Sequence, residues 1–551
     1  PSGFSVLGLD PSQNSTTLNG QPFGGADIPR DAAVGSSLAT SPYDVSRGGF
    51  SGGNFNLTSQ SGSNFKVRTS SLNLDAPQMQ WTDAAARALG QQYSNVSLGG
   101  RVSGPLKYNA AFYNLSFQGG RRSNDLQTLL NTSPLGLQTN GIAADSVARL
   151  LGILRQLGIP SSVGTPATQR VTDQGSLLGS FDLAPPQSRS GSAYNLTVNG
   201  SWNRMTPVSS LTSELPSHSG DRTTWNAGAQ FRHSTYFGIG VLSETTVGLN
   251  GADATSDPCL FMPSGTVRVN SAFADGTSSV KSIAFGGNGA LALGTRNTTA
   301  SFRNLLSWFS EDNKHRIKLT TEARRDAYTF DQTGNAYGSF SYNSLADLAA
   351  GKPAAFSRTL PPRNRSGSMM TGAISLGDSY RKSNTFQVQY GVRVDGNAFD
   401  GHPDRNPQVE QLFGLRNDKV PNRVYVSPRV GFSWSYGTAA QIGGFEGAFR
   451  GPRATVRGGV GVFQNTPGVQ SIGSAMDNTG LPSAVQQIAC TGVAVPSPSW
   501  GTYATNAGSI PAACADGSTG SVFANTAPNV NVFSPDYVSP RSVRGNLQWN
   551  G

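Results

Sequence analysis

The segment Phe386–Asp395 (FQVQYGVRVD) alternates apolar and polar residues along its whole length. Successive side chains of a β-strand point to opposite faces, so this period of two predicts a strand with one apolar and one polar face. We expect the apolar face to contact lipid; its residues are Phe386, Val388, Tyr390, Val392 and Val394. We expect Gln387, Gln389 and Arg393 to face a wet lumen.

The same alternation recurs along most of the chain, for example in Tyr194–Asn203 (YNLTVNGSWN). Roughly 14 strand-like segments follow residue 64, far more than the seven short strands of a sandwich domain of about 100 residues. No stretch approaches 18 consecutive apolar residues, which a transmembrane helix would need. A closed barrel is the other structure that can span a membrane, and it requires strands of this kind. The pattern therefore predicts an all-β fold, a transmembrane antiparallel β-barrel.

The composition agrees with a barrel and divides the chain unevenly. Only 13% of the 551 residues are charged, whereas a soluble domain carries about 25%. Residues 1–64 hold two Arg and four Asp, a net charge of −2, so the remainder carries +12 of the total +10. The basic residues are scattered, without the clustered stripe that a nucleic-acid surface needs. We expect them in solvated loops and at lumen-facing strand positions, and we expect no nucleic-acid partner.

The predicted connections are short and long in alternation, as between the two rims of an outer-membrane barrel. Short ones include Glu311–Lys314 and Gly377–Asn384, and long ones span about 121–173, 251–281, 329–366, 398–422 and 464–538. One long connection contains a helical pattern, Ala144–Leu157, with Asp145 as a plausible N-cap. This helix would either fold onto its own loop or lie on the membrane surface.

The chain has three cysteines, and their spacing favours one pair. Cys490 and Cys514 flank a segment rich in Pro, Ser and Gly that reads as one loop, whereas Cys259 lies far away. A disulfide closing such a loop would contribute on the order of 3 kcal/mol in an oxidising compartment. The alternative is three unlinked thiols. No CxxC or HxxxH spacing indicates zinc.

The search for catalytic motifs finds only isolated matches. Gly49–Gly53 (GFSGG) has the spacing of a nucleophile elbow around Ser51, but a strand-like segment follows it where the elbow needs a helix. The segment Asp400–Glu410 gathers acidic residues and His402 without the spacing of an EF-hand, so a solvated loop is favoured over a cation site. We expect neither an enzyme nor a cofactor.

Several motifs occur in an order that resembles one family. Early in the chain they are Thr17–Gly20 (TLNG), Ile28–Asp31 (IPRD), Tyr43–Gly53 (YDVSRGGFSGG) and Asn56–Asn64 (NLTSQSGSN). Later ones are Gly99–Leu106, Gly338–Leu348, Gly377–Asp395, Ser427–Trp434, Val456–Phe463 and Ser539–Trp549. The series resembles the plug and barrel of TonB-dependent outer-membrane receptors, and is most similar to the Oar-like group that carries an N-terminal carboxypeptidase-regulatory-like domain.

The resemblance implies a division of the chain at residue 64. Residues 1–64 would be the C-terminal part of the plug domain, and residues 65–551 the N-terminal part of the barrel, which is incomplete because such barrels have roughly 22 strands. The chain would then be a fragment that runs from mid-plug to mid-barrel. The cationic side chains of the plug part are Arg30 and Arg47. Each would either form a salt bridge to a carboxylate of the barrel wall or face lumen water.

The resemblance also implies a function and a location, the bacterial outer membrane. The protein would take up a scarce solute (a siderophore, cobalamin, a carbohydrate or a peptide), driven by the TonB complex, which would contact a part of the protein that precedes this chain. The expected partners are outer-membrane lipid, that complex and an unknown small solute. The alternative is a structural or adhesive surface barrel that transports nothing and acts through its long loops.

Overall fold

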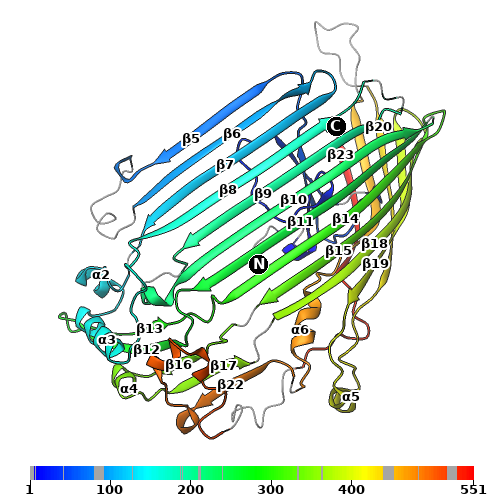
Figure 1. Cartoon of the computed structure of the whole chain (residues 1–551). Coiled ribbons are helices and arrows are strands. Elements are labelled where there is room, and N and C mark those ends of the chain that lie inside the picture. The colour runs from blue at the N-terminus through cyan, green and yellow to red at the C-terminus, as the bar shows by residue number, and fades with distance from the viewer. Residues whose placement is uncertain are drawn as a thin grey trace.

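The computed structural model describes residues 5–6, 8–40, 43–79, 92–126, 128–186, 188, 190–208, 213–238, 240–331, 334–360, 364–438, 452–481, 483–517 and 530–551. A 14-stranded antiparallel sheet dominates it (Figure 1). In chain order the strands are β5 (Val67–Asp75), β6 (Tyr93–Lys107), β7 (Ala111–Asp125), β8 (Gln169–Leu183), β9 (Ala193–Thr206), β10 (Gly220–Phe237), β11 (Val241–Pro258), β14 (Leu293–Phe309), β15 (His315–Asp331), β18 (Asn364–Arg381), β19 (Phe386–Asp400), β20 (Val424–Tyr436), β21 (Ala454–Gln464) and β23 (Arg541–Asn550). Each strand pairs with its predecessor within this sheet, so the predicted antiparallel order is confirmed.

The alternation of β19 separates two environments. Tyr390 and Val392 leave 47% and 44% of their surface exposed on the convex face, whereas Arg393 leaves only 3%. Arg393 points to the concave side, where it meets residues of the N-terminal segment. The sheet is the wall of a barrel, with an apolar outer face and a polar inner face.

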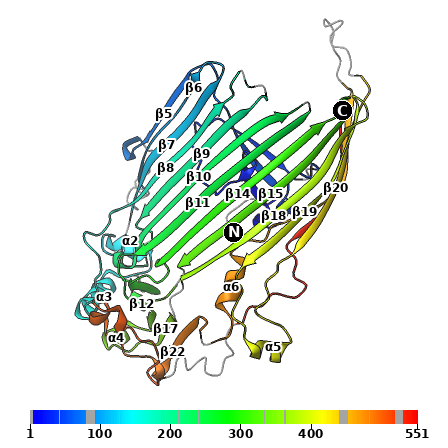
Figure 2. The same cartoon turned by 45° about the vertical axis from the view of Figure 1, so that its right-hand side comes forward.

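The sheet curves but does not close among the described strands. β5 and β23 lie at its two ends, and each pairs there with a single neighbour, β6 and β21. Figure 2 shows the wall as a deep trough with β5 and β20 on opposite sides. The expectation of an incomplete barrel is confirmed.

The connections alternate between two rims. On the short-turn rim they are 108–110, 184–192, 238–240, 310–314, 382–385 and 437–453, most of them short. On the long-loop rim they are 76–92, 126–168, 207–219, 259–292, 332–363, 401–423 and 465–540. The predicted turn Gly377–Asn384 is wrong in part, because β18 runs to Arg381 and the turn is 382–385.

The N-terminal residues form a separate small sheet inside the trough. Its strands are β1 (Ser15–Leu18), β2 (Gln21–Pro22), β3 (Val34–Ala39) and β4 (Asn54–Ser59), in the order β2-β1-β4-β3. Figures 1 and 2 both place these dark-blue strands against the concave face of the wall. Side chains bridge the two sheets: Asn19 Nδ2 donates to Thr197 Oγ1 at 3.1 Å, and Ser301 Oγ donates to Gln21 Oε1 at 2.9 Å. We call residues 5–64 the N-terminal unit.

The long loops form a third folded body, which we call the cap. Its strands β12 (Ser264–Ala272), β13 (Ser278–Gly286), β16 (Ser339–Tyr342), β17 (Ala355–Leu360) and β22 (Gln486–Thr491) make one five-stranded sheet. The helices α2 (Pro134–Thr139), α3 (Ala144–Gln156), α4 (Leu345–Ala349) and α7 (Trp500–Tyr503) contribute buried residues to the same body. Five connections that are separate in the sequence share this one hydrophobic core: 126–168, 207–219, 259–292, 332–363 and 465–540.

Helix α3 shows how the cap differs from the sequence-based expectation. The helix contacts α4 and β12, which belong to other connections, so the prediction that it folds onto its own loop is wrong in part. Its N-cap is Ala143, and Asp145 lies in the first turn, where a carboxylate favours the helix dipole. Leu150 and Leu154 are fully buried because they face the shared core.

The remaining elements are short. They are α5 (Pro407–Phe413), α6 (Ser471–Asp477), η1 (Pro11–Gln13), η2 (Pro77–Met79), η3 (Pro216–His218), η4 (Gly492–Ala494) and η5 (Ala507–Ser509). Within the described part of the chain, no helix has the length and apolar character needed to cross a membrane.

Candidate functional site

Residues 43–52 lie along the inner wall as one segment, which we call the docking strip. It contacts β14, β15, β18, β19, β20, β21 and β23. Phe50 is fully buried and its ring centroid lies 6.1 Å from that of Phe463 on β21. The strip corresponds to the motif YDVSRGGFSGG of the sequence, so this N-terminal motif makes extensive contact with the wall.

Glycines of four adjacent strands make room for the strip. A Cβ on Gly377 or Gly391 would lie 2.7 or 2.8 Å from Val45 Cγ2, too close for real atoms. A Cβ on Gly431 would lie 2.4 Å from Tyr43 Cδ2, and one on Gly459 would lie 2.6 Å from Tyr43 Cζ. Gly377 pairs with Gly391, and Gly431 with Gly459. These glycines form a shallow track in the wall that receives the two side chains.

Cations of the wall bind the strip, mostly through its backbone. Arg303 Nη2 donates to the carbonyl of Ser46 at 2.9 Å, and Arg429 Nη1 donates to the carbonyl of Arg47 at 2.6 Å. Arg544 on β23 donates to the carbonyl of Gly52 at 2.5 Å. A carbonyl oxygen is an acceptor, so this recognition works with almost any side chain on the strip.

One ion pair joins the strip to the wall directly, between Asp44 and Lys318 of β15. Burial alone would raise the pKa of Asp44. Lys318, together with hydrogen bonds from Ser46, outweighs the burial and brings the pKa down from 3.8 to about 2. Asp44 is therefore ionised at neutral pH.

A buried charge cluster lies beneath the strip at Gly48. Arg393 bonds Glu322 at 2.5 Å and Asp395 at 2.8 Å, and Glu322 also forms an ion pair with Arg303 at 3.1 Å. A Cβ on Gly48 would lie 2.2 Å from Arg393 Nε, so the strip rests directly on this guanidinium. Buried pairs of this kind specify a position more than they add stability.

The two arginines that the sequence singled out contact the wall in another way. The backbone N–H of Arg30 donates to Gln118 Oε1 at 2.9 Å, and Arg47 uses its carbonyl as described above. Both residues are exposed, and neither forms an ion pair with a described residue. Of the two alternatives for each arginine, a salt bridge to a wall carboxylate or contact with lumen water, the salt bridge is absent from the described contacts. At the strip the wall supplies the cations, and the strip supplies mostly backbone carbonyl acceptors.

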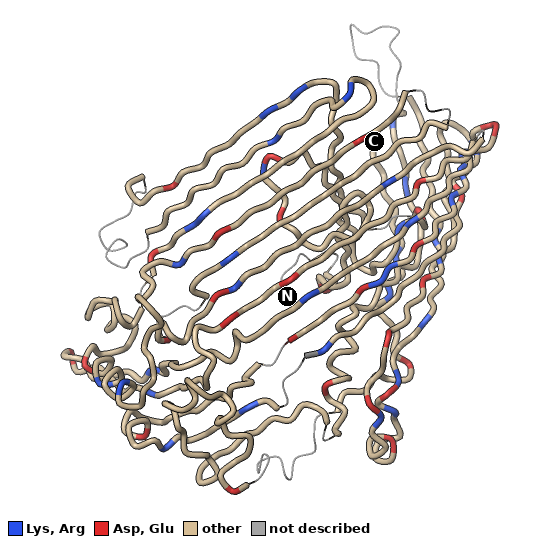
Figure 3. The backbone as a smooth tube through the Cα atoms, viewed as in Figure 1, with Lys and Arg blue, Asp and Glu red and all other residues tan. Residues whose placement is uncertain are grey.

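The alternation of β19 did place Arg393 in the lumen, but it gave no sign of a partner. Lys318, Arg303, Arg429 and Arg544 were not singled out by the sequence, although the last two lie in the motifs SPRVGFSW and SPRSVRGNLQW. Figure 3 shows Lys and Arg spread over many strands of the wall, and the docking strip contacts only a few of them.

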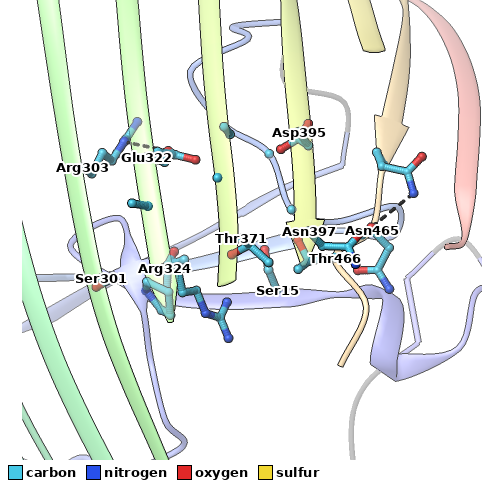
Figure 4. Close-up of a pocket in the computed structure, with 18 of the residues that line it drawn as sticks. Ser15, Ser301, Arg303, Glu322, Arg324, Thr371, Asp395, Asn397, Asn465 and Thr466 are labelled. Carbon is cyan, nitrogen blue, oxygen red and sulfur yellow. Dashed lines mark hydrogen bonds and ion pairs between the residues drawn. The ribbon is translucent and has the colours of Figure 1, made fainter. Parts of the chain in front are cut away.

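Two cavities lie between the N-terminal unit and the wall. The outer cavity, of about 360 Å³, reaches Asn397 near the end of β19 and Gln464–Gly468, where the chain enters the long loop 465–540 (Figure 4). The inner cavity, of about 350 Å³, reaches Asp44 and Lys318, close to the short turn 310–314. Residues that line both cavities mark the partition between them: Thr17, Gly20, Gly48, Arg303 and Glu322.

The other residues predicted from the sequence lie away from this site. Cys490 and Cys514 form a disulfide in the cap core, with a Cα–Cα distance of 5.6 Å, while Cys259 is free and exposed. Ser51 is fully buried and donates to Gln13 Oε1 at 2.9 Å. In the segment Asp400–Glu410, Glu410 pairs with Arg405 at 2.6 Å. No group of three or more His, Cys, Asp or Glu residues in the described ranges is placed to hold a metal ion.

Comparison with solved structures shows the fold. The outer membrane transporter YddB from Escherichia coli superposes with a TM-score of 0.56 at 13% identity, over 90% of this chain and 58% of YddB. The siderophore receptor PirA from Acinetobacter baumannii matches with a TM-score of 0.46 at 12% identity, over 84% of this chain and 55% of PirA. The chain thus spans little more than half the length of these proteins.

Comparison with known sequences identifies the family. No curated protein sequence matches the chain. The family model described as "Outer membrane beta barrel domain" matches residues 162–550. With the apolar outer face, the two unlike rims and the fold shared with YddB, this match establishes that the chain belongs to the outer membrane β-barrel domain family and that the protein is located in the bacterial outer membrane.

Proposed function

We propose that the protein is a TonB-dependent transporter that takes up a scarce solute through this barrel, with residues 1–64 as part of its plug domain. The observation that carries the proposal is the docking strip. It joins the N-terminal unit to the wall by contacts that are many, polar and individually weak, and that can be broken without unfolding the wall.

The chemistry of the strip suits repeated release. Carbonyl oxygens that leave Arg303, Arg429 and Arg544 find water in an opened lumen, and so do the guanidinium groups. An exchange of protein for water hydrogen bonds costs about 1.5–3 kcal/mol per bond when one partner is charged, as these guanidinium groups are. A pulling force could therefore separate the strip stepwise, whereas a broad apolar interface would resist until it failed as a whole.

The two cavities indicate what release of the strip from the wall would achieve. The outer cavity faces the long-loop rim and the inner cavity faces the short-turn rim, with Gly48 on Arg393 between them. Removal of the strip would join the two spaces into a continuous polar path. A solute bound in the outer cavity would then pass toward the periplasm.

The experiment uses the full-length protein in living cells and needs no knowledge of the solute. Ser46 is only 5% exposed, so a cysteine placed there by Ser46→Cys, in a Cys259→Ser background, should react with maleimide only when the strip leaves the wall. We expect labelling in wild-type cells, and loss of labelling when the TonB gene is deleted or a protonophore is added. Ser383→Cys, in the exposed turn 382–385, should label under every condition. Labelling of the Ser46→Cys protein that is unchanged without the TonB complex would contradict the proposal.

A second candidate function rests on the cap. An adhesive or structural barrel would act through its outer loops, and here five loops share one core that includes a disulfide. This function predicts that labelling at Ser46→Cys is independent of energy, and that surface attachment is lost when the cap is deleted. The labelling experiment therefore separates the two functions.

A further inference from the structure

Apart from Nε of Arg303, which is ion-paired with Glu322, three buried polar atoms of residues that line the outer cavity have no hydrogen-bond partner among the described residues. They are Nη1 of Arg393, Oε1 of Gln464 and Oδ1 of Asn397, and the exposed fractions of the three residues are 3%, 3% and 9%. The amide nitrogens are already engaged: Asn397 Nδ2 donates to the carbonyl of Pro421 at 2.9 Å, and Gln464 Nε2 donates to that of Ser539 at 3.1 Å. Turning either amide over would leave its nitrogen unpaired instead. The cavity therefore presents one donor and two acceptors.

This combination limits the chemistry of a ligand. A carboxylate or phosphate can accept from Arg393 but has no hydrogen for Gln464 or Asn397, and an ammonium group can only donate. A hydroxyl group does both, because it carries one donor and two acceptor lone pairs. Neighbouring hydroxyl groups on one ligand could complete all three atoms.

Other residues that line the cavity are also suited to bind hydroxyl groups. Figure 4 shows Thr371, Asn397, Asn465 and Thr466 gathered from β18, β19 and the start of the long loop, with Ser15 of the N-terminal unit beside them. Tyr425 also lines the cavity and offers an aromatic ring against which the apolar face of a sugar ring could lie. Small polar groups around a mainly fixed volume are what a compact, hydroxyl-rich ligand requires.

The charges of the lining favour a neutral ligand. Arg303 and Arg393 share Glu322, and Arg324 bonds Asp326 at 2.8 Å, so each guanidinium already has a carboxylate. An anionic ligand would have to displace one of these carboxylates, which are fixed to the wall. A neutral ligand can add hydrogen bonds at the edges of the pairs without breaking them.

We propose, on the basis of the transport function above, that the outer cavity binds a neutral saccharide of about one to three rings. The ring hydroxyls accept from Arg393 and donate to Gln464 and Asn397, and Thr371 and Thr466 complete the contacts. The solute class is then a carbohydrate rather than an anionic chelate or a peptide.

The test is calorimetric titration of the purified full-length protein in detergent. The probes are a panel of neutral mono-, di- and trisaccharides, together with citrate, a ferric hydroxamate, cobalamin and a dipeptide. We expect at least one neutral saccharide to bind. Thr371→Val keeps the side-chain shape and should weaken that binding about tenfold. Thr224→Val, a matched change on β10 outside both cavities, should leave it unchanged.

Other outcomes overturn the proposal. It fails if no neutral saccharide binds at millimolar concentration, if Thr371→Val and Thr224→Val have equal effects, or if only citrate, the hydroxamate, cobalamin or the dipeptide binds. Asn397→Leu gives an independent check, because it should weaken saccharide binding more than Thr371→Val. The maleimide experiment at Ser46→Cys does not depend on the solute, so energy-dependent labelling without saccharide binding would reject the carbohydrate and leave the transport function standing.

Discussion

Asp44 of the docking strip and Lys318 of β15 form an ion pair across the junction between the N-terminal unit and the barrel wall. Their side chains are 28% and 19% exposed, so water screens the pair only in part. It is the one point where a charged side chain of the strip, rather than its backbone, meets a cation of the wall among the described contacts.

This pair predicts a pH dependence. The pKa of Asp44 is lowered from 3.8 to about 2 in the docked state, so docking gains roughly 2 kcal/mol above pH 4 and loses it as the pH falls toward 2. Hydrogen exchange of residues 43–52 should therefore be constant from pH 7 to pH 4 and increase below it. Asp44→Asn should exchange faster at pH 7 and lack this transition. A transition of equal size in Asp44→Asn would show that other groups cause it.

The glycine track predicts a steric effect. Gly431→Ala would place a methyl group 2.4 Å from the ring of Tyr43 and should displace the strip, seen as faster proteolysis within residues 43–52. Gly175→Ala on β8 is the control, because a Cβ there meets no atom within 4 Å. Adding Tyr43→Ala to Gly431→Ala should restore part of the protection. Equal proteolysis of the two single variants would mean that the track does not hold the strip.

The two faces of β19 predict unequal tolerance of charge. Val392 lies on the exposed outer face, and an arginine there should cost about 2–4 kcal/mol near the bilayer midplane. Gln389, on the inner face, should accept an arginine. We therefore expect Val392→Arg to block assembly, measured by heat-modifiable mobility in gels, and Gln389→Arg to assemble. The same outcome for both variants would reverse the assignment of the faces.

Helix α6 follows a segment that lines the outer cavity, and the structure predicts which contact anchors this helix. Residues 464–468 line the cavity, and α6 follows them, with Ile472 buried against Tyr328 and Phe399. Asp477 bonds Arg365 at 2.8 Å, and both side chains are largely buried. Asp477→Ala leaves Arg365 without this partner and should destabilise the packing of α6 against the wall by about 3–5 kcal/mol. Spin labels on α6 and β19 should then report a broad distance distribution, which the double change Arg365→Met with Asp477→Leu should narrow again. A narrow distribution in Asp477→Ala would place the anchor elsewhere.

The wall was predictable because its information is local. Period-two alternation in Phe386–Asp395 reports the two faces of one strand, and adjacent strands pair in sequence order, so no long-range choice remains. The cap was not predictable for the opposite reason. β12 pairs with β16 in parallel, and β17 pairs with β22, although these strands belong to different loops and are short. No local pattern records such partners.

The candidate site was predictable only in part. The motif YDVSRGGFSGG marked the strip. The sequence singled out Arg30 and Arg47 by their charge, whereas most of the wall's hydrogen bonds to the strip are accepted by carbonyl oxygens, which every residue carries. The track in the wall that receives the strip consists of glycines, which leave room because they have no side chain. Backbone carbonyls and glycines occur throughout the sequence, so neither marks the site before folding.

The disulfide predicts that the cap and the wall lose structure separately. Cys490→Ser with Cys514→Ser should destabilise the cap by about 3 kcal/mol, because the bond closes a loop with a sequence separation of 24. Hydrogen exchange should rise in β17 and β22 and stay unchanged in β18 and β19. Cys259→Ser should have no effect. Uniform protection in all variants would mean that the cap core is stable without the bond.

The central claim is that the N-terminal unit closes the lumen and can be removed from it. The most direct measurement is the conductance of the full-length protein in planar bilayers, with and without the N-terminal unit. We expect the intact protein to be electrically silent and the deleted form to show large, steady conductance, because the strip and both cavities then become open lumen. A deleted form as silent as the intact protein would contradict the account.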